Sequence, residues 1–128
     1  MIFVIDHLKR ALDLVLSTAK EPLLTLGADL RVRKANDAFY RTFRMRPDET
    51  EGRFLYEAGQ GQWNTLDLRK LLEDVLPKSK EIRDFPLEAT FPETGRRNLL
   101  INAFRFYDEG WGLQMILMAI EDVTGNRG

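Results

Sequence analysis

Apolar residues recur at helical spacing near the start of the chain. The clearest members of this stripe lie three or four positions apart and are Leu8, Leu12, Val15 and Ala19. Such spacing gathers side chains on one face of a helix, and Asp6 is suited to cap its N-terminus. We predict an amphipathic helix from about Asp6 to Ala19, which ends before Pro22 because proline forces the preceding residue out of helical geometry.

The middle of the chain mixes short strands with short helices. Proline, glycine and helix-capping residues such as asparagine separate its apolar stretches. These residues are typical of the ends of helices and strands. The expected elements are strands at 22–26 and 31–35, a helix after Asn36, a short helix from Pro47 to Gly52, and a helix from Thr65 to Leu76.

Three longer apolar stretches, at 82–91, 98–107 and 113–123, complete the chain. Short turns connect them, so they are expected to pair as an antiparallel meander. Helices gathered between strands favour an α+β domain in which helices cover one face of an antiparallel sheet. The last strand is unusual, because Met115 to Ile120 is apolar at both parities, which predicts that both faces of this strand are covered.

Composition narrows the function classes. The chain has 128 residues, a formal net charge of −1 and no cysteine. A near-neutral domain lacks the basic surface that nucleic-acid binding needs. Zero cysteine removes disulfides, thiolate metal sites and cysteine nucleophiles. The N-terminus has no signal-peptide core and no apolar run reaches membrane-spanning length, so we expect a cytoplasmic segment without membrane contact.

Three stretches resemble the PAS (Per-Arnt-Sim) family. Residues 24–32 are similar to its opening hairpin, 35–39 to its "N-x-A-F" helix start, and 120–124 to its "D-[IV]-T" ending. Further stretches at 39–43, 49–53 and 61–63 resemble the subgroup found in bacterial sensor histidine kinases and chemotaxis-methylation fusions. The resemblance implies a five-stranded antiparallel sheet in the order 2-1-5-4-3. It also implies a leading helix at 1–21, a PAS domain at 22–124 and the start of a linker at 125–128.

In such a fold the last strand would present alternate residues to the helices and to the outside. The residues expected to line a helix-facing pocket are Val32, Phe39, Phe43, Leu68, Leu72, Phe85, Leu100, Asn102, Phe104, Met118 and Ile120. The residues expected to form an outer cover or dimer face are Leu8, Leu12, Val15, Ala19, Met115, Leu117 and Ala119. Asp122 and Thr124 would form the exit through which a signal leaves the domain.

Cofactor chemistry is constrained by the residues that these family members use. The position of the photoactive cysteine is apolar in the similar stretch Gly52-Arg53-Phe54-Leu55, so cysteinyl flavin photochemistry is excluded. The helix expected at 65–76 has no histidine, which disfavours haem, and no metal site is expected. We expect no tightly bound cofactor. A non-covalent flavin contacted by Asn98 or Asn102, or a small apolar ligand, stays open.

Other chemistry-bearing residues favour simpler interpretations. His7 lacks the acid and proline of a phosphoacceptor box and is expected to be a solvated helix residue. Six basic residues occur close together, but acids are interspersed through the rest of the chain, which favours a solvated face. These residues are Arg31, Arg33, Lys34, Arg41, Arg44 and Arg46.

The sequence therefore predicts a regulatory module, not an enzyme. It would form a homodimer, sense a signal and relay it to a downstream effector. The effector expected from the resemblance is a histidine kinase. A pure dimerisation domain is the alternative. A small cone-shaped α+β enzyme is a further one, and it would require an acid or a histidine projecting into an apolar cavity.

Overall fold

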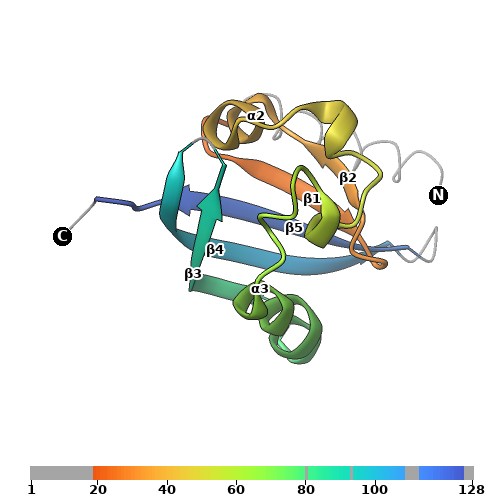
Figure 1. Cartoon of the computed structure of the whole chain (residues 1–128). Coiled ribbons are helices and arrows are strands. Elements are labelled where there is room, and N and C mark those ends of the chain that lie inside the picture. The colour runs from red at the N-terminus through yellow and green to blue at the C-terminus, as the bar shows by residue number, and fades with distance from the viewer. Residues whose placement is uncertain (1–18, 80, 93, 109–112, 126–128) are drawn as a thin grey trace.

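Five antiparallel strands form one sheet in the order β2-β1-β5-β4-β3, with short helices over one face (Figure 1). A computed structural model describes residues 19–79, 81–92, 94–108 and 113–125. The α+β fold class and the strand order are confirmed. The strands are β1 (Leu23–Gly27), β2 (Val32–Ala35), β3 (Glu81–Phe91), β4 (Gly95–Asp108) and β5 (Leu113–Asp122).

The predicted N-terminal helix lies outside the described residues, apart from its last position. Leu8, Leu12, Val15 and His7 therefore belong to the undescribed segment, whereas Ala19 is half-buried.

Strand β1 occupies the centre of the sheet together with β5. All five of its residues are buried, and it pairs with β2 on one side and β5 on the other. Leu24 lies opposite both Ala35 and Met118, so one leucine contacts two neighbouring strands. This interior position explains why β1 is buried at both parities, including the polar Thr25, because a strand that is covered on both faces does not alternate in burial.

Helix α2 (Asp37–Phe43) begins at the predicted cap. The buried Asn36 side chain accepts hydrogen bonds from the N–H groups of Phe39 and Leu23, each at 3.0 Å, and donates one to the carbonyl of Glu21 at 2.9 Å. One amide therefore caps α2 and ties it to the start of β1.

The predicted helix at 65–76 is broken into three turns of different pitch. Helix α3 (Leu66–Lys70) continues as a π-helical turn, Leu71–Val75, and a 3-10 turn, Leu76–Lys78. Thr65 caps α3 by accepting a hydrogen bond from the N–H of Leu68 at 3.1 Å. Because Pro77 has no N–H to donate, regular α-helical bonding cannot pass through it. Figure 1 shows α2 and α3 on the same face of the sheet, and they contact β1 and β3 respectively.

The two edge strands of the sheet, β2 and β3, are protected in different ways. Along β2, the segment at 52–55 adds backbone hydrogen bonds, including Val32 N–H to the carbonyl of Arg53 at 2.8 Å. Along β3, a bulge interrupts the pairing between Ile82 and Phe85, where Asp84 has a φ of 53°. Bulges and charged residues at an edge strand oppose uncontrolled strand pairing.

Candidate functional site

The helix-facing side of the sheet gathers most of the residues predicted to line a pocket. Those buried in its single hydrophobic core are Val32, Phe39, Phe43, Leu68, Leu72, Met118 and Ile120. Phe85 is half-buried and packs against this core. The segments that supply these side chains are far apart in the sequence, so the fold brings them together.

Three of the predicted pocket residues lie on the opposite face, which corrects the parity expected for β4. Leu100 and Asn102 are only half-buried, and the Phe104 side chain is 43% exposed. The residues of β4 that enter the core are instead Leu99, Ile101 and Ala103. The register is the cause, because Ile101 lies opposite Ile120 and Ala103 opposite Met118, and a shift of one residue exchanges the two faces of a strand.

Asn102 has a structural role at the β3 bulge. Its Oδ1 accepts a hydrogen bond of 3.1 Å from the N–H of Asp84. Asn98 is exposed on β4. Neither amide faces the core, so the flavin contacts considered for them do not arise on the helix side of the sheet.

A cluster of aromatic rings fills the core between α2 and β3. Trp63 is completely buried and stacks on Phe39 at a centroid distance of 5.8 Å. Phe43 and Phe91 complete the cluster, with Phe43 at 5.0 Å from Trp63 and 5.1 Å from Phe91. The indole N–H of Trp63 donates to the sulfur of Met45 at 3.3 Å. Sequence analysis did not assign Trp63 to the core, although its large apolar ring was a signal for burial.

A cavity of about 340 Å³ opens where this core meets the end of the helical segment. Apolar side chains dominate its lining, and two charged residues, Glu73 and Arg105, also reach it. The apolar lining consists of Ala28, Leu30, Leu72, Leu76, Pro77 and Ile116. Of the predicted pocket residues, only Leu72 lines this cavity.

Glu73 is held by two neighbours. Its carboxylate accepts a hydrogen bond of 3.1 Å from the hydroxyl of Tyr56 and lies 3.8 Å from the guanidinium of Arg69, which also covers the Tyr56 ring. Burial and the hydrogen bond to Glu73 raise the pKa of Tyr56, so its hydroxyl stays protonated. The charge of Glu73 is therefore already partnered.

The outer face of the sheet carries the residues predicted for a cover. Met115, Leu117 and Ala119 are half-buried and alternate with the buried Ile116, Met118 and Ile120. A hollow of about 380 Å³ lies over β3, β4 and β5 on this side. Its lining includes Phe104, Leu117 and Ala119, with Glu81 and Arg83 among the polar members.

The predicted exit is fixed to the neighbouring strand by polar contacts. Asp122 lies 3.5 Å from the guanidinium of Arg97, and its other carboxylate oxygen accepts a hydrogen bond of 2.9 Å from the N–H of Thr124. The Thr124 hydroxyl accepts a further bond of 2.8 Å from the N–H of Asn98. Asp122 and Thr124 together fasten the end of β5 to β4.

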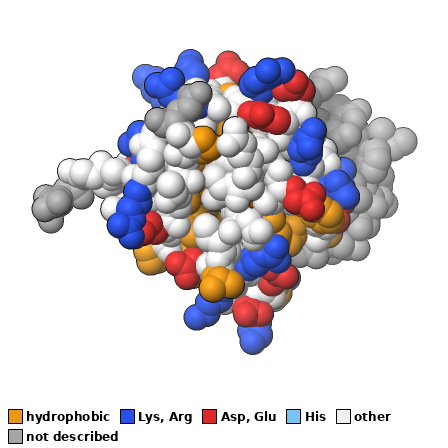
Figure 2. Space-filling model, viewed as in Figure 1, with side chains coloured by type: hydrophobic (Ala, Val, Ile, Leu, Met, Phe, Trp, Pro, Cys, Tyr) orange, Lys and Arg blue, Asp and Glu red, His pale blue; other side chains and the backbone are white. Residues whose placement is uncertain are grey.

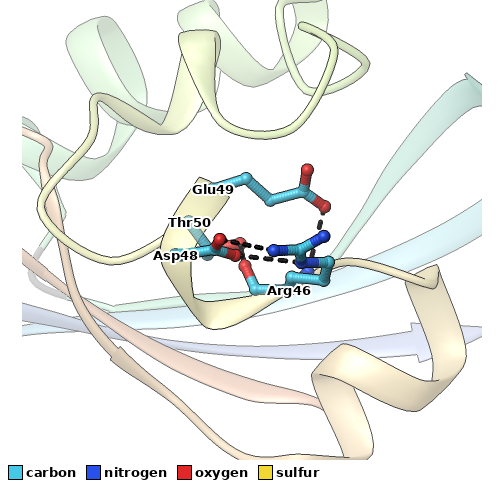
Figure 3. A network of polar contacts seen from close by, with 4 residues as sticks. All are labelled: Arg46, Asp48, Glu49 and Thr50. Carbon is cyan, nitrogen blue, oxygen red and sulfur yellow. Dashed lines mark hydrogen bonds and ion pairs between the residues drawn. The ribbon is translucent and has the colours of Figure 1, made fainter.

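Three of the six basic residues near β2 and α2 form ion pairs with acids. Arg31 and Arg33 both approach Asp29, at 3.8 Å and 3.9 Å. The Arg46 side chain contacts Asp48 at 2.6 Å, and the backbone N–H of Arg46 donates a hydrogen bond of 3.0 Å to the carboxylate of Glu49. Figure 3 shows how these contacts close the 3-10 turn Pro47–Glu49, and the Arg46 hydrogen bond lowers the pKa of Asp48.

Charges of both signs are interspersed on the helix-bearing face of the molecule (Figure 2). Neither sign forms a continuous patch in this view. Among the described residues, no helix has the length and apolarity needed to cross a membrane.

Comparisons with known proteins agree with this geometry. A family model described as the PAS fold matches residues 16–128. The chain therefore belongs to the PAS family. A search of curated proteins found no significant match.

Solved structures with the same fold come from several proteins. The PAS domain of Bordetella pertussis BvgS is 19% identical, with a TM-score of 0.72, and 91% of this chain and 86% of that chain are covered. A PAS domain from a two-component sensor histidine kinase is 14% identical, with a TM-score of 0.66 and coverages of 91% and 96%. A Rhodobacter sphaeroides LOV protein is 15% identical, with a TM-score of 0.70 and coverages of 90% and 66%. At these identities the likeness is one of fold.

Proposed function

We propose that this chain is a sensory module that forms a homodimer and relays a signal to a downstream effector, in the manner of a histidine kinase sensor. The observation that carries this proposal is the construction of β5. Its Ile116, Met118 and Ile120 enter the core, its Met115 and Leu117 face outward, and its end is fastened to β4. One strand thus connects the core, an apolar outer face and the exit.

The occupant that we propose for the outer face is a second copy of this chain. Phe104, Leu117 and Ala119 give that face an apolar hollow. Burying an apolar side chain contributes about 1.5–3 kcal/mol, so several such residues on each subunit favour association. The apolar stripe expected at residues 6–19 would extend the same interface.

Analytical ultracentrifugation of the purified chain tests the homodimer. We expect the wild type to sediment as a dimer and Leu117→Glu as a folded monomer, because the new carboxylate would be desolvated in the interface. Leu66→Glu is the matched control, since Leu66 on α3 is 85% exposed and lies outside the proposed interface. Phe104→Glu is a second interface variant in case Leu117→Glu fails to fold. A monomeric wild type would overturn this part of the proposal.

The relay is tested separately from association. Thr124→Val removes the hydroxyl that accepts the Asn98 N–H while keeping the side-chain shape. In the full-length protein that carries this domain, we expect the variant to alter effector activity while the dimer persists. Unchanged effector activity would favour the alternative of a pure dimerisation domain.

The enzyme alternative has little support from the core. Among the described residues, the buried polar side chains are Thr25, Asn36 and Thr50, none of which is an acid or a histidine. Glu73, the carboxylate at the cavity, is bonded to Tyr56. We therefore propose a regulatory role for the domain. Its location in the cytoplasm is part of the same proposal.

A further inference from the structure

Two charged residues, Arg97 and Arg105, belong to the inward-facing row of β4, and Arg97 is paired with Asp122. Arg105 follows Leu99, Ile101 and Ala103 at the two-residue period of the strand, and it lies opposite the buried Ile116. The row that enters the core thus reaches a half-buried arginine at the cavity.

The guanidinium has no partner within the described part of the chain. No hydrogen bond or ion pair joins Arg105 to another residue there. Glu73, the nearby acid in the cavity lining, is bonded to Tyr56 and paired with Arg69. The three charges of this region, Glu73, Arg69 and Arg105, therefore sum to one positive charge at the cavity.

The rest of the lining suits a short apolar chain. Leu30, Leu72, Leu76, Pro77 and Ile116 surround the space, and Ala28 lies at the exposed side. A volume of about 340 Å³ lies near the lower end of the range of about 300–1,000 Å³ for small-molecule pockets. A ligand of about ten non-hydrogen atoms matches this space.

We propose that this cavity binds a monocarboxylate with a short apolar chain, its carboxylate on Arg105 and its chain against Leu30, Leu72 and Ile116. Guanidinium and carboxylate form two parallel charge-assisted hydrogen bonds, which distinguish a carboxylate from an alcohol of the same length. This inference rests on the proposed sensory function and names the class of signal that the module takes.

Titration calorimetry with sodium octanoate tests the site, using 1-octanol and acetate as comparison ligands. We expect saturable binding of octanoate. The affinities of 1-octanol and acetate should be at least tenfold weaker, because 1-octanol lacks the carboxylate and acetate lacks the apolar chain. Arg105→Met should weaken octanoate at least tenfold while leaving octanol unchanged. Arg105→Lys should give an intermediate affinity, because it keeps the charge and loses the two parallel hydrogen bonds. Arg96→Gln, an exposed arginine of the same strand, is the matched control and should bind as the wild type does.

Two further measurements locate the ligand. Ala28→Trp should block the cavity without disturbing the core, since Ala28 is exposed in the turn after β1. In methyl-labelled NMR spectra, octanoate should shift the signals of Leu72 and Ile116 but not that of Leu117 in the outer hollow. Absent binding, equal affinity of octanol, unchanged affinity of Arg105→Met, or shifts confined to Leu117 would each overturn the proposal.

Failure of this site is distinguishable from failure of the proposed function. The dimer and relay experiments use no ligand, so they can succeed while octanoate fails to bind. In that case the sensory module stands and the carboxylate class of ligand is wrong.

Discussion

The guanidinium of Arg97 lies 3.5 Å from the carboxylate of Asp122, joining the first part of β4 to the last residue of β5. Both side chains are partly accessible, at 31% and 22%. Because solvent screens such a pair, it contributes geometry more than stability. Because the pair lies at the exit, it holds the end of β5 in register with β4.

The first prediction concerns this pair. In a double-mutant cycle with Arg97→Gln and Asp122→Asn, urea unfolding should give a coupling energy below about 1 kcal/mol. Amide hydrogen exchange at Thr124 should nevertheless accelerate in Asp122→Asn, because the carboxylate that accepts its N–H is weakened. Arg96→Gln serves as the control and should leave this exchange rate unchanged. Protection of Thr124 equal to that of the wild type would contradict the role of Asp122.

A second prediction concerns the cap of α2. Asn36→Ala should lower the free energy of unfolding by about 2–3 kcal/mol, because it removes a helix cap and leaves the buried N–H of Leu23 without its side-chain acceptor. Asn36→Asp should recover only part of this loss, since it keeps the acceptor but sets a second oxygen against the carbonyl of Glu21 in place of the N–H donor. The exposed neighbour Asp37, changed to Ala, is the control for chemical denaturation. Equal losses in the free energy of unfolding for the Ala variants of Asn36 and Asp37 would contradict the role of the Asn36 hydrogen bonds.

The parity of β4 leads to a third prediction. Ile101→Ala should destabilise the domain by about 2–5 kcal/mol, because Ile101 is completely buried and its loss leaves a cavity. Leu100→Ala removes a leucine one position earlier that is only half-buried, and should cost about 1 kcal/mol. Thermal and urea unfolding of the two variants provide the comparison. The reverse order would restore the parity expected from the sequence.

Alkaline pH provides a fourth prediction. Burial, followed by the charge of Glu51, raises the pKa of Tyr40, and burial together with the Glu73 hydrogen bond raises that of Tyr56. Above the ordinary tyrosine pKa of about 10, the unfolded chain releases these protons while the folded chain keeps them. The folded state then binds more protons, so stability falls as pH rises.

Urea unfolding between about pH 8 and pH 11 measures this effect against the lysine background. The double variant Tyr40→Phe, Tyr56→Phe should lose stability less steeply with pH than the wild type. Identical slopes would show that the two hydroxyls ionise as freely in the folded protein as in the unfolded one.

Much of the sheet was predictable because its signals are local. Residues 22–26 and 31–35 were placed as strands, and the structure forms β1 and β2 within one residue of these bounds. Asn36 was expected to cap a helix and does so. The alternation of β5 was also assigned correctly, with Ile116, Met118 and Ile120 in the core.

The candidate site was less predictable, because it depends on contacts between distant segments. On β4 both parities carry apolar residues, and polar residues interrupt both rows, such as Asn102 in one and Arg105 in the other. Periodicity therefore could not choose between them. Trp63 was also missed as a core residue. It lies between two predicted helices, where no periodic pattern of apolar residues indicates which side chains are buried.

The sequence by itself determined the strands of the sheet and the two-faced character of β5, because capping residues, turns and short-range periodicity carry this information. The family and the order of the strands followed from the resemblance of its motifs to those of the PAS family. Only the tertiary structure decided which face of β4 enters the core, where Trp63 packs and that Arg105 meets an apolar cavity. The physical reason is that inter-strand register is set by packing across the whole sheet. A shift of one residue leaves the local pattern of β4 unchanged while reversing every side chain.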